Sequence, residues 1–388
     1  MMATNNLGLS RRSIVKAATI VPFSAVAGSA ANSAVTVGLI GSGRRGPGLA
    51  RFAEQDKRGQ VVALSDILDE KIERAKKKIG VVNPKTFKDY RELLASDVDA
   101  VIIATPNHLH PEHFEAAIKA KKHIYLEKPV ANTVAGCKRI MRAADSADRN
   151  LNITIGLQRR YAYVYKKAKA LFDSGSIGEI RMARASFIEG EEPEKDQILP
   201  RPTTARERYQ TGTGIQGVPR WAHWEETAGR RMVAAEVHSM DVVNWFLESL
   251  PIKAIGTNGR TTRTRGDLTD HGYALYDYPK GIQVVLEGSV LAPPFYRDVK
   301  EQFFTATDVI ETAQEHWKHY QGRGQVVQEN SPRSTTQDSI EAFVARVADG
   351  KPENIGVQGA ESTLTAMLGS MAANLRREVS WDEMMESE

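Results

Sequence analysis

The first half of the chain alternates between short apolar runs rich in β-branched residues and longer stretches whose apolar positions recur with helical spacing. Near-continuous apolar strands separated by helices predict a parallel sheet covered by helices on both faces. We therefore predict a doubly wound α/β domain over residues 34–157. Its expected strands are residues 35–40, 60–64, 100–104, 123–126 and 151–155, and its expected helices are 47–57, 69–79, 111–120 and 133–147.

The regular alternation of short apolar runs and helical stretches ends after Gly156, and the pattern beyond it predicts an α+β domain over residues 158–388. The segment 190–230 is rich in Glu, Arg, Pro, Gly and Thr, and a loop of that length in a compact domain is usually functional. The expected helices are 158–172, 234–247, 338–348 and 358–376, and the expected strands are 180–189, 252–260, 271–278 and 282–291, the last three antiparallel.

Residues 1–33 are set apart by Arg11 and Arg12, which a weakly apolar stretch over 17–27 follows. That stretch is shorter than the roughly 20 apolar residues that span a bilayer. Paired arginines, a short apolar run and small residues after it are typical of a twin-arginine signal peptide. We expect export to the periplasm by the twin-arginine machinery, with a disordered basic tail as the alternative.

The composition is that of an ordinary globular protein and narrows the function. Of 388 residues, 41% are hydrophobic and 26% are charged, and the net charge is only +4. This balance gives no support for nucleic-acid binding or a polybasic membrane anchor, and we expect no membrane span in the mature chain. Cys137 is the only cysteine, which excludes an internal disulfide and a cysteine-based metal cage.

A glycine-rich segment with the spacing G-x-G-x-x-G directly follows the first predicted strand. Glycines in this place let the turn tighten and let the backbone approach a pyrophosphate at the N-terminus of the next helix. The segment therefore predicts a Rossmann domain that binds a dinucleotide. Its expected contacts come from Gly41, Gly43, Arg44, Arg45 and Gly46.

Asp66 ends the second predicted strand, about twenty residues beyond the glycines. A carboxylate there holds the ribose hydroxyls of NAD and disfavours the 2′-phosphate of NADP, so NAD is the expected cofactor. Arg44 and Arg45 keep NADP open, since an arginine near this loop accommodates the extra phosphate. A helix N-cap is the structural alternative for Asp66.

The segment 105–110 follows the strand 100–104 at the carboxyl edge of the sheet, where ligands bind in open α/β folds. We predict contacts to the nicotinamide ribose from Thr105, Asn107 and His110. A metal site on the histidines of this region is the alternative, but no cysteine or paired carboxylate completes a ligand set. We therefore expect no metal.

Lys128 follows the next strand, in the tripeptide Glu127-Lys128-Pro129. A lysine that is partly desolvated beside a cationic nicotinamide has its pKa lowered, so it can orient a hydroxyl and share its proton. A surface lysine at a helix start is the alternative, although its charge would oppose the helix macrodipole. We predict that Glu127 and Lys128 line the cofactor and that Lys128 is catalytic.

His238 lies in the first turn of the helix predicted over 234–247, and Asp241 and Trp245 share its face. Histidine titrates near neutral pH and is the usual general base for an alcohol. A buried structural histidine is the alternative. Beside a cofactor domain, we predict that His238 is catalytic.

Together these segments resemble the Gfo/Idh/MocA family, named for glucose–fructose oxidoreductase and inositol dehydrogenase, over about residues 34–300. The resemblance implies sugar or polyol substrates bound between the Rossmann domain and a C-terminal domain with an open, mostly antiparallel sheet. It also implies that this sheet packs against another subunit in a homodimer or homotetramer, and that Lys128 and His238 are the catalytic pair. The residues expected to bind the substrate are Arg159, Arg160, Tyr161, Trp221 and Asp241.

One position departs from the family pattern. Many members read D-x-G-x-H up to the catalytic histidine, but this chain has Ala234 in place of the acid and carries Glu236 instead. Two steps along a helix rotate a side chain by about 200°. Glu236 therefore replaces the acid only if the segment 234–238 is extended, because alternate side chains then share a face.

Three functions follow from these residues. The leading hypothesis is an NAD(P)-dependent oxidoreductase that acts on a sugar, a polyol or a sugar derivative. The second is a glycosidase or lyase that oxidises its sugar transiently with no net redox change, although relatives of that kind often lack the lysine kept here at Lys128. The third, motivated by Ala234, is a non-catalytic sugar- or partner-binding protein.

Overall fold

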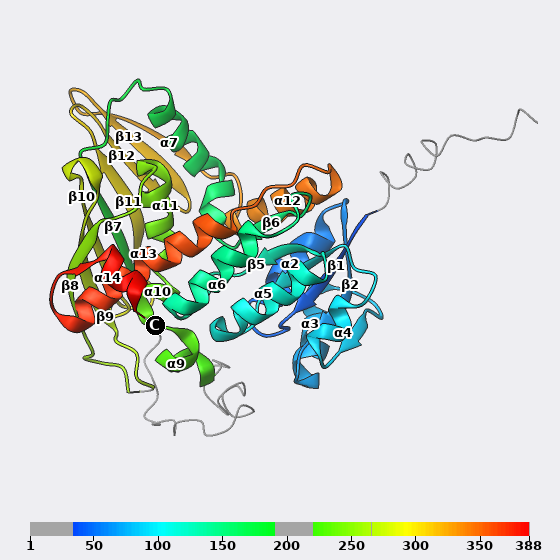
Figure 1. Cartoon of the computed structure of the whole chain (residues 1–388). Helices are drawn as coiled ribbons and strands as arrows, with labels where there is room; N and C mark the ends of the chain where they lie inside the picture. The colour runs from blue at the N-terminus through cyan, green and yellow to red at the C-terminus, as the bar shows by residue number, and fades with distance from the viewer. Residues whose placement is uncertain (1–33, 191–219, 265, 388) are drawn as a thin grey trace, which may run out of the picture. The chain divides into compact units, whose positions relative to one another are not determined.

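The computed structural model describes residues 34–190, 220–264 and 266–387 (Figure 1). The expected export signal over 1–33 and most of the expected functional loop, 191–219, lie outside these residues. The described residues form one β-sheet of six strands and another of nine. The predicted fold class, a doubly wound α/β half followed by an α+β half, is confirmed.

The six-stranded sheet has the order β3-β2-β1-β4-β5-β6, and all neighbouring strands are parallel. This is a doubly wound order, in which the direction of winding reverses between β1 and β4. The five predicted strands are present, and β3 was not predicted because it is short, polar and mostly exposed. The strands are β1 (Val35–Ile40), β2 (Gly59–Ser65), β3 (Lys85–Phe87), β4 (Ala100–Ile103), β5 (His123–Leu126) and β6 (Ile153–Ile155).

Helices cover both faces of this sheet, as predicted. One face packs against α2 (Gly46–Gln55) and α3 (Asp69–Ile79), and the other packs against α4 (Tyr90–Leu94), α5 (His110–Lys119) and α6 (Val134–Asp145). The first of these cores also receives α12 (Thr335–Ala348) from far along the chain. The ring of Phe343 on α12 lies 5.7 Å from the ring of Tyr125 on β5.

The nine-stranded sheet has the order β14-β13-β12-β11-β7-β10-β9-β8-β15, and only the β7–β10 pair is parallel. The four strands predicted here are confirmed as β7 to β10. Strands β11 to β14 were not predicted, because charged and polar residues interrupt their apolar positions. The strands are β7 (Met182–Glu189), β8 (Lys253–Gly259), β9 (His271–Asp277), β10 (Gln283–Ser289), β11 (Arg297–Phe304), β12 (Val309–Ala313), β13 (His316–Gln321), β14 (Gln325–Asn330) and β15 (Val379–Ser380).

Helix α13 (Gly356–Leu375) connects the two sheets. It packs against β8 and β9 of the nine-stranded sheet and against α6 and β6 of the first half (Figure 1). Close approach requires small residues, since a Cβ at Gly359 would lie 2.6 Å from a side-chain carbon of Ile155. Two more helices, α7 (Tyr163–Asp173) and α11 (Val237–Leu247), join this core, and none of the described helices is long and apolar enough to cross a bilayer.

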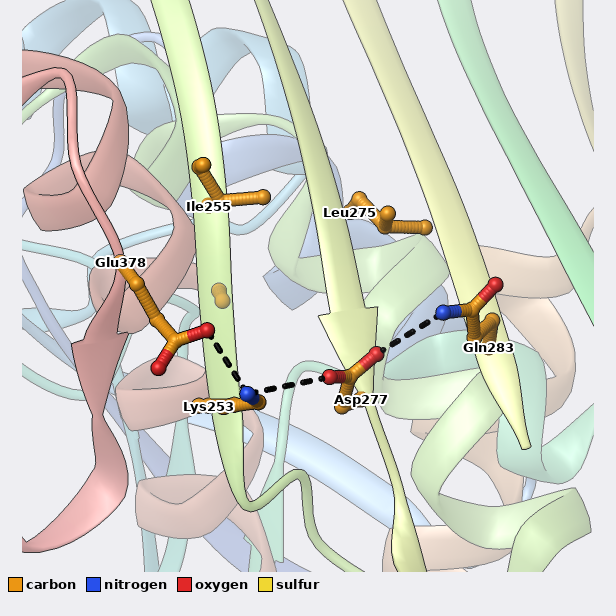
Figure 2. Close-up of a pocket in the computed structure, with 7 residues that line it drawn as sticks. Lys253, Ile255, Leu275, Asp277, Gln283 and Glu378 are labelled. Atoms are coloured by element: carbon orange, nitrogen blue, oxygen red, sulfur yellow. Dashed lines mark hydrogen bonds and ion pairs between the residues drawn. The ribbon is translucent and has the colours of Figure 1, made fainter. Parts of the chain in front are cut away.

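The opposite face of the nine-stranded sheet carries exposed apolar residues among the described part of the chain. Ile255, Tyr273 and Val285 lie on neighbouring strands and are 48%, 47% and 40% exposed. A shallow hollow of about 200 Å³ lies at one end of this face, where the Lys253 ammonium lies 2.7 Å from a carboxylate oxygen of Glu378. Figure 2 shows the side chains that line it. An exposed sheet face with apolar residues is typical of an interaction surface.

Candidate active site

The glycine loop between β1 and α2 has the geometry that a dinucleotide requires. Gly41 has a φ of 94°, and a Cβ there would lie 2.7 Å from the backbone carbonyl of Ala104. A Cβ at Gly46 would overlap the carbonyl oxygen of Gly41, so both positions need glycine. Gly43 differs, because its Cβ would meet no atom within 4 Å. The loop is therefore closed towards the sheet and open at Gly43, where a pyrophosphate can approach the helix N-terminus.

Asp66 lies at the end of β2, beside this loop. Its carboxylate accepts hydrogen bonds from the backbone N–H of Ser42 (2.9 Å) and of Leu68 (3.0 Å). Burial raises the pKa of Asp66, and these two hydrogen bonds oppose the shift. The N-cap residue of α3 is Leu68, so the simple N-cap interpretation of Asp66 is wrong. Its place next to the glycine loop is the one expected of a ribose-binding carboxylate.

The two arginines of the loop have different surroundings. Arg44 is exposed, whereas Arg45 donates to a carboxylate oxygen of Glu127 (2.7 Å) and to the amide oxygen of Gln158 (2.9 Å). Arg45 thus anchors the glycine loop to the end of β5. Glu127 also accepts from the backbone N–H of Lys128 (3.0 Å), so its carboxylate positions the lysine as well.

The segment after β4 is held by hydrogen bonds within the protein. The ring of His110 lies between the carbonyl oxygens of Pro129 (2.7 Å) and Thr105 (2.9 Å). The Asn107 amide donates to the carbonyl of Ala228 at 2.6 Å. Contacts from Asn107 and His110 to the cofactor stay a prediction. Both connect loops at the edge of the site.

Lys128 extends from the first half of the chain to the second. Its ammonium donates to the backbone carbonyl of Ala234 at 2.7 Å, at the end of helix α10 (Arg231–Ala234). Burial lowers the pKa of Lys128, and the negative charge of Glu127 opposes that shift most strongly. The predicted proton-handling lysine thus lies against the segment that leads into His238.

His238 is the second residue of α11 and is buried. Burial lowers the pKa of His238 well below its ordinary value, and the positive charges of Lys128 and Arg159 lower it further. The imidazole is therefore neutral at physiological pH. Its Nδ1 has no hydrogen-bond partner among the described residues. The fold thus brings a neutral imidazole within electrostatic reach of the Lys128 ammonium.

Three predicted substrate residues turn out to stabilise the second half. Arg160 makes a bidentate ion pair with Asp241, from Nη2 to Oδ1 (2.7 Å) and from Nε to Oδ2 (3.0 Å), and Asp241 also accepts from Ser362 (2.8 Å). The hydroxyl of Tyr161 donates to Glu353 at 3.1 Å. These polar groups are engaged with one another or with α13 and its flank, and binding of substrate by Arg160, Tyr161 and Asp241 stays a prediction.

The other two predicted substrate residues have different outcomes. Arg159 is buried in an ion pair with Glu301 and also donates to Ser239 at 3.1 Å, although its Nε and Nη2 have no partner among the described residues. The prediction that Arg159 grips a substrate directly is therefore not supported by its main contacts. Trp221 is partly exposed in the short helix η4 (Arg220–His223), and its role stays a prediction.

The sequence interpretation missed Arg231, whose guanidinium forms a buried ion pair with Glu236. Residues 231–234 form α10, and Glu236 is the N-cap of α11 with helical dihedrals of −72° and −10°. The segment 234–238 is therefore not extended, and Glu236 does not share a face with position 234. The available signal was two charged residues in an otherwise apolar stretch.

Two family models match the chain in succession. The model described as an oxidoreductase family with an NAD-binding Rossmann fold matches residues 35–154, and the GFO/IDH/MocA C-terminal domain matches residues 165–307. Inositol 2-dehydrogenase 3 of Saccharopolyspora erythraea is 29% identical over 256 residues, which cover 65% of this chain and 66% of that protein. Inositol 2-dehydrogenase of Salmonella typhimurium is 35% identical over 146 residues, 37% of this chain and 42% of the relative. The matched segments thus span two thirds or less of these relatives.

Solved structures share the fold over most of the chain. Scyllo-inositol dehydrogenase from Lactobacillus casei, solved with NAD(H) and scyllo-inositol, has a TM-score of 0.71 at 20% identity and covers 90% of this chain and 100% of its own. A levoglucosan dehydrogenase in complex with NADH and levoglucosan has a TM-score of 0.75 at 18% identity and covers 90% of this chain and 99% of its own. At these identities the likeness concerns the fold.

Proposed function

Because the chain belongs to the Gfo/Idh/MocA family of oxidoreductases, we propose that it transfers a hydride between NAD and a sugar or polyol. One observation carries the proposal. Lys128 from the Rossmann half lies against the segment that leads into His238 of the second half, with the Lys128 ammonium 2.7 Å from the Ala234 carbonyl, and its positive charge lowers the pKa of His238. The named substrates of the relatives, inositols and levoglucosan, support a polyhydroxylated substrate.

The residues at the glycine loop fit NAD. The open face at Gly43 admits the pyrophosphate, and Asp66 lies where the ribose hydroxyls are bound. Arg44 is exposed beside the loop, so a second, weaker affinity for NADP is part of the proposal. When bound, NAD supplies the acceptor for the hydrogen and the electron pair that leave the substrate carbon.

His238 and Lys128 have different roles at the substrate hydroxyl. The neutral imidazole of His238 accepts the hydroxyl proton as the carbon loses its hydrogen with the bonding pair. The Lys128 ammonium donates a hydrogen bond to the same oxygen and stabilises the negative charge that develops on it. In the reverse direction His238 returns the proton to the carbonyl oxygen.

The test is turnover on a panel of inositols, aldoses and anhydrosugars with NAD, followed by the absorbance of the reduced nicotinamide. We expect oxidation of at least one polyol, and we expect Lys128→Met to abolish it while NAD binding is retained. Release of an aglycone from aryl glycosides with no net reduction would instead favour the glycosidase or lyase hypothesis. Binding of sugar with no turnover on any substrate would favour a binding protein.

We also propose that the protein is exported with its cofactor bound. The support is the paired Arg11 and Arg12 and the short apolar stretch after them. Free NAD is scarce outside the cytoplasm, so a second substrate would recycle the bound cofactor. A reporter fused behind residues 1–33 should reach the periplasm, and the change of both arginines to lysine should keep it in the cytoplasm.

We propose that the protein is a homo-oligomer whose subunits pack together through the open face of the nine-stranded sheet. Its support is the row of exposed apolar residues at Ile255, Tyr273 and Val285, beside the hollow in Figure 2. Light scattering of the purified protein should give a dimer or a tetramer. A monomer at micromolar concentration would contradict this assignment.

A further inference from the structure

The short helix α9 (Glu225–Ala228) is attached to the Rossmann half by its last three carbonyl groups. The final carbonyls of a helix have no partner within the helix. Here each of the three contacts a polar side chain from a loop of the Rossmann half. The pairs are Asn132 Nδ2 with the Glu226 carbonyl (2.8 Å), His108 Nδ1 with the Thr227 carbonyl (3.2 Å) and Asn107 Nδ2 with the Ala228 carbonyl (2.6 Å).

The other end of α9 is attached to the second half. The backbone N–H of Glu225 donates to a carboxylate oxygen of Asp267 at 2.7 Å. The backbone N–H of Asp267 in turn donates to the carbonyl of His223 at 3.1 Å. Asp267 belongs to the loop between β8 and β9 of the nine-stranded sheet. Helix α9 therefore connects a loop of the second half to two loops of the first.

The loops under α9 lie at the edge of the sheet where a dinucleotide binds. Asn107 and His108 follow β4, and Asn132 follows β5, so all three lie at the carboxyl edge of the parallel strands. In doubly wound folds the ligand occupies the crevice at this edge, where the winding reverses between β1 and β4. Thr227 and Ala228 are 2% and 3% exposed, so α9 is packed against these loops. Helix α9 therefore covers the end of the crevice beside β4 and β5.

The attachment of α9 is small enough to open. The helix has only four residues, and its contacts with the two halves are mainly single hydrogen bonds to its backbone. A segment with few apolar contacts opens locally at a low cost in free energy. Gly229 ends α9 with a φ of 76°, and a Cβ there would lie 3.2 Å from the Cβ of Asn132. This glycine gives the chain a flexible joint at the point of contact.

We propose that α9 is a clasp that must open before NAD enters or leaves the crevice, and that Asn132 and Asp267 are positioning residues that hold it closed. This inference rests on the proposed function only for the identity of the dinucleotide. Each residue binds the backbone of α9 from a different half of the molecule. The closed form neither takes up nor releases the cofactor, so the clasp slows exchange in both directions.

The experiment measures association and dissociation rates of NADH with the full protein, stripped of nucleotide, by stopped-flow fluorescence. In Asn132→Ala we expect both rates to rise about fivefold, since one hydrogen bond shifts the opening equilibrium by about that factor. The dissociation constant should stay within about twofold of the wild-type value, because entry and exit need the same opening. Asp267→Ala should raise both rates at least about fivefold as well, although Asp267 holds the end of α9 away from the Rossmann half.

A matched control is Asn150→Ala. Asn150 is exposed in the loop before β6, at the amino edge of the same parallel sheet. This variant should leave both rates unchanged. A residue that binds NADH directly would behave differently from a clasp residue, because its loss raises the dissociation rate and weakens affinity by the same factor.

Hydrogen exchange checks the opening of α9 without any cofactor. The backbone N–H groups of Thr227 and Ala228 donate to the carbonyl of Trp224 at 3.1 and 2.8 Å. Both amides should exchange about fivefold faster in Asn132→Ala and in Asp267→Ala than in the wild type.

Two results would overturn the inference. One is unchanged NADH rates in both variants. The other is a faster dissociation with an equal loss of affinity in Asn132→Ala and no effect of Asp267→Ala, which would make Asn132 a cofactor contact. A wild-type protein with no turnover on any polyol, but with NADH rates that respond to both substitutions, would refute the proposed function and leave the clasp standing.

Discussion

Replacing Gly43 by alanine should weaken NAD binding without destabilising the protein, whereas replacing Gly41 should destabilise the fold itself. Both glycines belong to the same loop, and the two substitutions add the same methyl group. At Gly41 the methyl group would lie 2.7 Å from the Ala104 carbonyl, while at Gly43 it would meet no atom within 4 Å. The pair therefore separates a steric demand of the fold from a steric demand of the cofactor.

The magnitudes follow from the geometry. A non-glycine residue at the φ of 94° found for Gly41 costs about 1–2 kcal/mol. Overlap with a packed backbone adds about 1–3 kcal/mol. Gly41→Ala should thus lower the free energy of unfolding by about 2–5 kcal/mol. Gly43→Ala should change it by no more than about 0.5 kcal/mol, as is usual for a surface position. Its methyl group blocks the close approach of the pyrophosphate, so NAD affinity should fall at least ~10-fold, about 1.4 kcal/mol.

Two measurements check this prediction. Urea unfolding of the protein stripped of nucleotide gives the stability of each variant, and isothermal titration calorimetry gives the dissociation constant of NAD. Wild-type NAD affinity in Gly43→Ala would show that the pyrophosphate does not approach this loop. Wild-type stability in Gly41→Ala would contradict the contact with the Ala104 carbonyl.

Four further outcomes are expected. Lys128→Met should lower kcat at least ~100-fold with little change in the NAD dissociation constant, and equal losses in both would indicate a structural role. Because burial and the Lys128 charge lower the pKa of His238, its imidazole stays neutral as pH falls, so kcat/KM should stay level through the usual histidine range; an inflection near pH ~6.5 would contradict this. Asp66→Ser should reduce the preference for NAD over NADP at least ~10-fold, measured as the ratio of kcat/KM values, and an unchanged ratio would remove Asp66 from the ribose site. Val285→Lys should convert the oligomer to smaller species in light scattering, and an unchanged mass would place the interface elsewhere.

Local patterns were sufficient wherever a short segment carries the whole signal. The strands and helices predicted in the first half have strong periodicity, and their boundaries in the structure differ from the predicted ones by at most two residues. Two short elements there, β3 and α4, were not predicted. The cofactor-binding glycine loop and the candidate catalytic Lys128 could also be predicted from the sequence. Each is marked by a short segment, a turn in one case and the end of a strand in the other. In contrast, β11 to β14 have mixed polar sequences, and they form a sheet because β11 pairs with β7 and each following strand pairs with the one before it.

The partners of the buried ion pairs could not be predicted from the sequence. Arg160 and Arg159 follow the Rossmann half directly and suggest substrate binding, yet their carboxylates lie 81 and 142 residues away at Asp241 and Glu301. The sequence alone determined which residues bring charge and a titratable group to the site. Tertiary packing decided which of these charges neutralise each other inside the core and which remain to act on a substrate. The physical reason is that a buried charge must find a partner in space, and distance along the chain does not predict that partner.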